Sequence, residues 1–443
     1  MRTPLVLVMW IFLLGACSHK KESIEGNGEG LLILKGVRLV DGLGSPARPN
    51  VTIVVKDDRI RSILDPKEVL PFRAKVLELE GKTVMPALMS AHVHLGMTRG
   101  TEVGSKQITA ENDMNQLYKL RKYGVGAVLS LGMDTDVIYK IRSDSERSDS
   151  TLPLVLTAGR GFGVPDGAPP SAMGIDQVYR PRTVNEARKQ VRELLAKKPN
   201  VIKIWVDDFN GKMKKKMSPE IYKVLIAEAH AQKVRVAAHV YYLEDAKLLA
   251  KEGVDILAHS VRDQPVDLEL ISLMKTKNIS YVPTLSVDES QFIFEKKHEW
   301  METDFFREAL DPGVLQWLQT SYQAKPSAVE ELRMAQKNVM TLFKSGIVIG
   351  LGTDSGANLA RIQGFSEHRE MQLLVDAGLE PEEVIRIATV NNSNILGLSN
   401  DYAGVQVGMK ANLIVLDADP IDDIRNTQKI NMVFINGRSI ERR

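Results

Sequence analysis

Eight short apolar runs, separated by helical patterns, occupy the middle of the chain and limit the folds that it can adopt. The runs cover residues 86–92, 126–132, 152–158, 201–206, 234–240, 256–261, 280–285 and 347–353. The segments between them carry helix signals, such as Ser218 and Pro219 at the start of a predicted helix over 219–232. Strands that alternate with helices predict a parallel sheet, and eight such units predict a (β/α)8 TIM-type barrel of the α/β class.

The two ends of the folded part have a different pattern. Residues 31–86 and 399–443 contain short β-rich runs that turn residues separate. We therefore expect a small β-sandwich domain built from both chain ends, beside a barrel over 87–398. With 443 residues, 44% of them hydrophobic, the chain can form a large core. A formal net charge of +2, with no long basic face, gives no indication of nucleic-acid binding.

Residues 1–17 predict a targeting segment. Arg2 precedes an apolar run over 5–14, which is too short for a permanent membrane span, and Cys17 follows. The segment resembles a bacterial lipoprotein signal with its lipobox. This resemblance implies a lipid anchor on Cys17 and, with Ser18 behind it, a place in the cell envelope at the outer membrane, facing the periplasm. An ordinary secretory signal is the alternative. The polar residues 18–30 predict a flexible tether.

Polar residues recur at the ends of the predicted strands, where a barrel places its reactive groups. The first strand ends in two histidines one residue apart, and side chains at this spacing leave the same face of a strand. The full set is His92, His94, Lys203, His239, His259 and Asp354. Singly, each could be a core histidine, a turn aspartate or an ion-paired lysine. Together they predict a site for a divalent metal such as zinc.

These residues lie in motifs that resemble the amidohydrolase superfamily. The motifs are PALMSAHVHL, VIKIWVDD, VAAHVYYLEDAK, ILAHSVRD and IGLGTDSGA. The resemblance is to the branch of imidazolonepropionase-like proteins and metal-dependent Xaa-Pro-type dipeptidases. Two positions depart from the usual pattern, since Ser90 stands in place of an aspartate and Ala87 in place of a glycine.

The resemblance implies a role for each ligand. His92 and His94 would bind one metal with Asp354, and a second metal would be bound by the other two histidines, His239 and His259. Lys203, converted to a carbamate by CO2, would bridge the two divalent ions, which we expect to be Zn2+. The implied reaction is hydrolysis of an amide C–N bond by a metal-bridging hydroxide, with Asp354 as general base and then general acid.

The expected substrate is a small molecule, most simply a dipeptide or an N-acyl amino acid. Tyr241, Tyr242 and Arg262 follow the fifth and sixth strands and are predicted substrate contacts, although the tyrosines could instead pack the loop. Two other functions stay open at this point. One is a mononuclear deaminase or imidazolone-type cyclic amidohydrolase, and the other is a lactonase or phosphotriesterase-like hydrolase.

A long insertion over 286–340 carries many of the aromatic residues of the chain. It could form a lid over the substrate, a packed helical unit or a surface between copies in a homo-oligomer.

Overall fold

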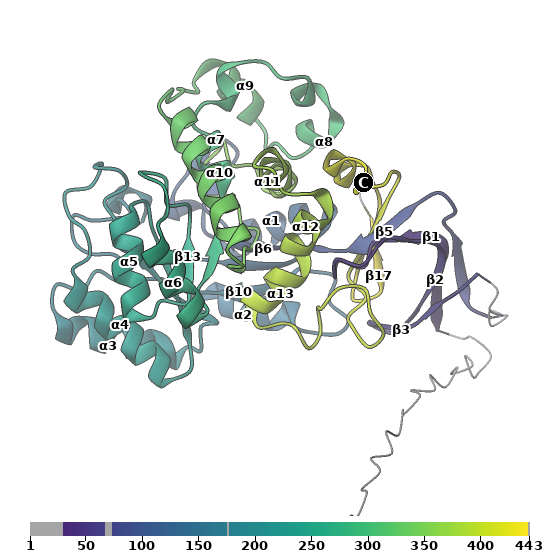
Figure 1. Ribbon diagram of the computed structural model, residues 1–443, viewed down its shortest axis with the longest axis horizontal. Helices are drawn as coiled ribbons and strands as arrows, with labels where there is room; N and C mark the ends of the chain where they lie inside the picture. Colours follow the sequence, from purple (N-terminus) through teal and green to yellow (C-terminus); the bar gives the residue numbers. More distant parts are fainter. Residues whose placement is uncertain (1–29, 67–72, 175–176, 442–443) are drawn as a thin grey trace, which may run out of the picture.

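The computed structural model describes residues 30–66, 73–174 and 177–441 (Figure 1). The predicted signal segment, Cys17 and residues 18–29 of the predicted tether lie outside the described residues. Across the described ranges, no helix combines the length and the apolar character that a bilayer crossing requires.

A closed barrel of parallel strands forms the larger part of the molecule. Its strands are β6 (Leu88–Val93), β9 (Val125–Ser130), β10 (Leu154–Thr157), β11 (Val201–Trp205), β12 (Arg235–His239), β13 (Ile256–Ala258) and β14 (Ser280–Val282). They pair in parallel in two groups, β10-β9-β6 and β11-β12-β13-β14. Single parallel bridges complete the circle, from Phe162 to Ile204 on one side and from Tyr281 to Ile349 on the other. The predicted (β/α)8 architecture is therefore confirmed.

The eighth predicted strand, 347–353, pairs with its neighbours through isolated bridges. Ile349 pairs with Tyr281 of β14, and Ser355, just beyond the predicted strand, pairs with Val93 of β6. Its two glycines explain how it fits so closely. A Cβ atom on Gly352 would lie 2.8 Å from the Cβ atom of His92. The backbone can therefore approach β6 at His92 only where no side chain intervenes.

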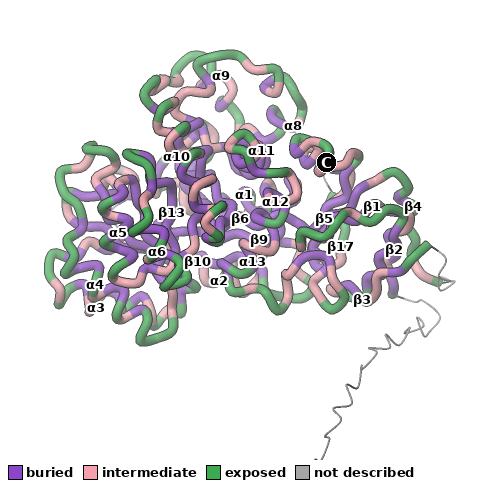
Figure 2. Tube along the Cα trace, in the orientation of Figure 1, coloured by how far each residue is buried: buried purple, intermediate pink, exposed green. Residues whose placement is uncertain are grey.

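Helices cover the outside of the barrel. They include α1 (Ala110–Lys122), α2 (Val137–Ser145), α3 (Val184–Ala196), α4 (Pro219–Ala231), α5 (Leu243–Glu252), α6 (Leu268–Lys277) and α11 (Phe365–Asp376). The helix predicted over 219–232 is α4. Figure 2 shows buried residues along the barrel strands and exposed residues on the outward turns of these helices. This distribution is the amphipathic pattern expected of a helix with one face on a sheet.

Strands from both chain ends lie in one eight-stranded sheet. From the N-terminal part come β1 (Leu31–Leu39), β2 (Arg48–Lys56), β3 (Arg59–Leu64), β4 (Lys75–Glu78) and β5 (Thr83–Pro86). The C-terminal part adds β15 (Leu413–Leu416), β16 (Ile430–Ile435) and β17 (Arg438–Ile440). The ends meet where β5 pairs antiparallel with β15, and β5 leads directly into β6. Side chains alternate between two buried clusters, so that Ile53 and Val55 join one and Val54 joins the other.

The insertion between β14 and the eighth segment is helical. It contains α7 (Leu285–Glu289), α8 (Asp304–Arg307), α9 (Val314–Thr320) and α10 (Ala328–Lys344), drawn in green in Figure 1. Its aromatic side chains pack on one another and on α11, as Phe306 does against Trp300 and Phe365. Most of these aromatic residues therefore serve helix packing, while other residues of the insertion form a wall of the cavity described below.

Candidate metal centre and active site

Histidine and aspartate side chains from four strand ends meet inside the barrel. The Nε2 atoms of His92 and His94 lie 3.2 and 2.9 Å from Oδ1 of Asp354. The ring of His92 lies 4.6 Å from that of His259, which in turn lies 4.2 Å from that of His239, measured between centroids. Ligand atoms of His92, His94 and Asp354 all fall within 4.8 Å of one another, a spacing suited to one metal ion.

The backbone turns sharply at two of these positions. His259 and Asp354 have φ angles of 75° and 54°, which residues other than glycine rarely adopt. Such strain persists only where the surrounding structure supports it, and it is often found at functional sites. Here it directs the two side chains from the strand ends into the cluster.

The electrostatics of the cluster favour cation binding. Burial and the charge of Lys203 lower the pKa of His92 to about 3, and burial also lowers the pKa values of His239 and His259 well below the usual range. The imidazoles are therefore neutral and have lone pairs to donate. Burial opposes ionisation of Asp354, yet the guanidinium of Arg361 and the imidazole of His92 hold its pKa well below the usual range.

Lys203 lies fully buried on β11, and its Nζ atom has no hydrogen-bond partner among the described residues. Burial lowers the pKa of this amine to about 7. A buried ammonium without a partner is costly, so the site favours the neutral amine. The Nζ atom of Lys203 and the Nδ1 atoms of His92 and His239 have no hydrogen-bond partner among the described residues. With the ionised carboxylate of Asp354, these side chains form a donor set that fits divalent cations.

Contacts behind the histidines orient their rings. His94 places Nδ1 3.0 Å from the carbonyl oxygen of Gly132, and His259 places Nδ1 2.7 Å from the hydroxyl of Thr284. Both rings thus keep Nε2 for a cation. His239 is reversed, with Nε2 3.3 Å from Oδ2 of Asp207 and a buried Nδ1 that has no partner among the described residues.

Two further residues at the centre, Asp207 and Arg361, were not predicted from the sequence. Asp207 directly follows β11, where the motif VIKIWVDD could have identified it as a strand-end carboxylate. Arg361 contacts Oδ2 of Asp354 from a loop seven residues downstream, and no signal in the sequence marks it. The carboxylate of Asp354 therefore lies between two imidazoles on one oxygen and a guanidinium on the other.

A cavity of about 240 Å³ opens beside the cluster and is lined by both apolar and polar side chains. The apolar ones come mainly from β11 and the loops after the first four strands, and they are Met97, Met133, Pro169, Met173, Trp205 and Phe209, with Val287 and Ala357 from later in the chain. The polar ones come mainly from the later loops and the insertion, and they are Tyr241, Arg262, Gln291, Lys325, Glu331, Asn358 and Arg361, with Asn210 and Lys212 from the loop after β11. Thioether and aromatic side chains adapt to varied apolar groups, whereas the polar residues can orient a charged one.

The structure separates the three predicted substrate contacts. Tyr241 and Arg262 line the cavity, with the guanidinium carbon 4.7 Å from the tyrosine ring centroid. Tyr242 is not among the lining residues, and its hydroxyl donates to Oδ1 of Asp208 at 2.9 Å. The prediction that Tyr242 contacts substrate therefore has no support in this geometry, because its polar atom is turned to another loop.

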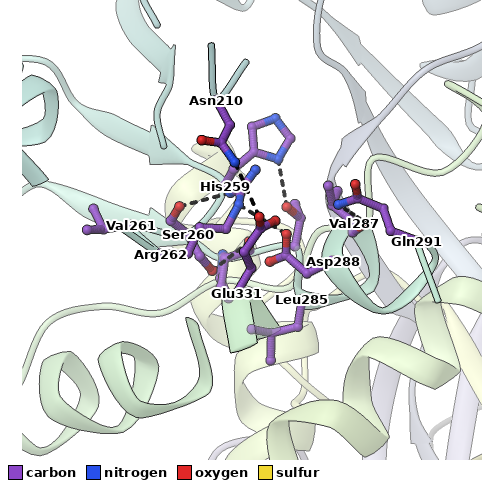
Figure 3. Close-up of polar contacts among 12 residues, drawn as sticks. Asn210, His259, Ser260, Val261, Arg262, Leu285, Val287, Asp288, Gln291 and Glu331 are labelled. Carbon is purple, nitrogen blue, oxygen red and sulfur yellow. Dashed lines mark hydrogen bonds and ion pairs between the residues drawn. The ribbon is translucent and has the colours of Figure 1, made fainter. Parts of the chain in front are cut away.

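Figure 3 shows how Arg262 is held. Its Nε atom lies 3.0 Å from Oδ1 of Asp288, and Nη1 donates to the carbonyl oxygen of Ser260 at 2.9 Å. Beside it, the carboxylate of Glu331 accepts hydrogen bonds from Asn210 at 3.2 Å and from Lys325 at 2.6 Å. The contact between Asn210 and Glu331 connects the loop after β11 to the insertion, and both residues line the cavity.

A parallel barrel with histidine, lysine and aspartate side chains at its strand ends defines a metal-dependent hydrolase. A sequence model of the amidohydrolase family matches residues 83–440, so the chain belongs to that family. It is a hydrolase that acts on carbon–nitrogen bonds.

Individual relatives are similar over most of the chain. The ochratoxinase of Aspergillus niger is 26% identical over 439 residues, which cover 88% of this chain and 82% of that protein. Its crystal structure superposes with a TM-score of 0.72 at 21% identity, covering 92% of this chain and 95% of that chain. The crystal structure of a Xaa-Pro dipeptidase with bound methionine gives a TM-score of 0.76 at 21% identity, covering 93% and 100%. At these identities the structural comparisons show the shared fold.

Proposed function

We propose that the protein hydrolyses the amide bond of a dipeptide or an N-acyl amino acid with two divalent cations at the histidine cluster. The observation that carries this proposal is the lining of the cavity beside the cluster, which combines apolar side chains with four cationic ones. With a scissile amide at the cluster, an apolar acyl group would contact the apolar side chains. The carboxylate of the amino acid that leaves would contact the cationic ones.

The polar residues of the lining suit a free carboxylate. Four cationic side chains, from Lys212, Arg262, Lys325 and Arg361, line the cavity against the carboxylates of Glu331 and Asp354. Because Arg262 uses Nε and Nη1 for contacts within the protein, its Nη2 atom is left for a substrate oxygen. Guanidinium groups are well suited to carboxylate recognition. The bound methionine of the Xaa-Pro dipeptidase structure is a free amino acid of this chemical type.

The residues of the chain would divide the work as follows. His92, His94 and Asp354 would hold one cation, and His239 and His259 would hold the second. When bound, such cations polarise a carbonyl and ionise water near neutral pH. Asp354, whose pKa is low, is ionised and can accept a proton from water and pass it to the amine that leaves.

Lys203 would complete the site as a carbamate. Its neutral amine can add CO2, forming an N–C bond and releasing one proton, which converts a neutral group into an anion with two oxygens. The Nζ atom has no hydrogen-bond partner among the described residues, which supports this modification. A carbamate at this position would be stabilised by the bound cations. A bicarbonate requirement during metal loading would be its signature.

The test is a panel of dipeptides and N-acyl amino acids assayed on zinc-loaded protein, each beside its C-terminal amide. We expect turnover of the free acids, a kcat/KM at least about tenfold lower for the amides, and close to two cations per chain. Arg262→Met combined with Asp288→Leu removes both partners of the buried pair and should abolish the discrimination. Turnover of lactones alone, or deamination with one cation per chain, would support the other functions instead.

The N-terminal prediction also stays a proposal. We propose that lipidation at Cys17 anchors the enzyme in the bacterial envelope, on the strength of residues 1–17. Labelling with a radioactive fatty acid should mark the wild type and leave Cys17→Ser unlabelled, whereas equal labelling of both would contradict the anchor.

A further inference from the structure

A buried carboxylate on α11 links the two strand ends that carry three of the six ligands. Glu367 is fully buried, and its Oε1 atom accepts hydrogen bonds from the hydroxyls of Thr353 at 2.7 Å and Ser355 at 2.9 Å. The hydroxyl of Ser90 reaches the same oxygen at 3.4 Å. Oε2 accepts the backbone N–H of Gly364 at 2.8 Å. Four donors thus converge on one carboxylate.

These partners are the immediate neighbours of metal ligands. Thr353 and Ser355 flank Asp354, whose backbone has the strained φ of 54°. Ser90 lies two residues before His92 on β6, at the start of an irregularity between Ser90 and Val93 in the pairing with β9. The Oε1 atom of Glu367 therefore contacts both neighbours of the strained Asp354, and it also contacts Ser90, which precedes His92 on β6.

The position of Ser90 provides a probe of this arrangement. Its hydroxyl faces the carboxyl group of Glu367. An aspartate at position 90 would bring a second carboxyl group against the first in a buried site, where burial already raises the pKa of Glu367. The two groups could not both be ionised at low energetic cost.

We infer that Glu367 is a positioning residue for Asp354 and His92, and that Ser90 is its matched partner, a donor small enough to leave room for the carboxyl group from α11. The inference concerns the ligand cluster and holds for any substrate of the site. Its failure is therefore distinguishable from failure of the proposed amide hydrolysis.

The experiment measures Co2+ binding and the visible spectrum of the cobalt protein, so that the readout is the site and not turnover. We expect Glu367→Gln to weaken Co2+ binding about 10- to 100-fold and to change the spectrum, as loss of a group that orients a ligand does. Ser90→Asp should weaken binding as well, because two carboxylates then meet. The double variant Ser90→Asp with Glu367→Gln should bind more tightly than either single variant.

His368→Gln is the matched control. His368 lies on the same helix and is also buried, but its ring nitrogens lie 3.0 Å from the hydroxyl of Thr427 and 2.8 Å from the carbonyl oxygen of Tyr123, away from the ligands. It should leave Co2+ affinity within about threefold of the wild type. Equal losses in the two glutamine variants, or an unchanged affinity and spectrum in Glu367→Gln, would overturn the inference, as would a double variant no better than the worse single one.

Folding of each variant is checked by circular dichroism and thermal unfolding of the metal-free protein. If Glu367→Gln does not fold, Ser90→Ala is measured in its place, since this variant removes one weak donor from Oε1 of Glu367. An approximately twofold loss of Co2+ affinity is then expected, on the scale of one neutral hydrogen bond at a long distance. An affinity equal to that of the wild type would count against the role of Glu367.

Discussion

The Nε2 atom of His239 lies 3.3 Å from Oδ2 of Asp207, which makes this imidazole the reverse of its neighbours in the cluster. His94 and His259 use Nδ1 for contacts within the protein, whereas His239 leaves Nδ1 without a partner among the described residues. Asp207 is itself fixed, because its Oδ1 accepts the N–H of Phe209 at 2.7 Å. The pair therefore determines which nitrogen His239 can offer to a cation.

Substituting Asp207 should weaken the second cation specifically. Asp207→Asn keeps the size of the side chain but can turn a donor toward Nε2, so we expect about 10- to 100-fold weaker binding of one cation. Metal analysis after gel filtration should then show close to one ion per chain. The control is Asp208→Asn, which changes the next carboxylate, bonded to Tyr242. Two retained ions in Asp207→Asn, or the same loss in Asp208→Asn, would contradict the role of Asp207.

The barrel and the candidate metal-binding residues at its strand ends were accessible from the sequence because both are local in the chain. Each strand is one apolar run, and His239 or Asp354 stands at the end of its own run, so strand periodicity and barrel geometry suffice. The contacts of Glu367 and Arg361 were not accessible. They join residues through loops whose paths are set by packing between distant elements, and no periodicity encodes them. Tyr242 shows the same limit, since adjacency to His239 did not determine where its hydroxyl turns.

Lys203→Met should separate the metal role of the lysine from its cost to stability. Without a bridging group, we expect one cation per chain and a loss of activity of about 100-fold or more. The metal-free protein should at the same time gain about 1–3 kcal/mol of unfolding free energy, because an unpartnered buried amine is replaced by an apolar chain. Metal analysis and urea unfolding measure the two effects. Lys189→Met, on the exposed face of α3, is the control and should show neither.

The ion pair of Arg262 with Asp288 predicts a non-additive cycle. Both side chains are buried, at 7% and 0% exposure, so loss of one partner leaves a charge in an apolar site. Arg262→Met alone should lower the unfolding free energy by about 3–5 kcal/mol, and Asp288→Leu by a similar amount. The double variant should lose much less than their sum, because no charge is then stranded. Urea unfolding of the four proteins checks this, and simple additivity would show that the pair contributes little.

Asp113 on α1 predicts a pH-dependent gain in stability on removal of its charge. It is 2% exposed, its Oδ1 has no hydrogen-bond partner among the described residues, and burial raises its pKa to about 7. The folded state then retains a proton between pH 4 and 7 that the unfolded chain has released. Unfolding therefore releases this proton, and the contribution of Asp113 to stability falls as pH rises through that range and levels off above it.

Asp113→Asn cannot lose this proton, so its advantage over the wild type should grow from pH 5 to pH 8. We expect a gain on the order of 1–3 kcal/mol in unfolding free energy at pH 8 and a smaller one at pH 5, since an ionised, unpaired carboxylate is the costlier group to bury. Urea unfolding at four pH values measures the trend. Glu111→Gln, on the same helix but exposed, should stay within about 0.5 kcal/mol at every pH. A gain in Asp113→Asn that is equal at all pH values would mean that the folded protein does not hold the proton on Asp113.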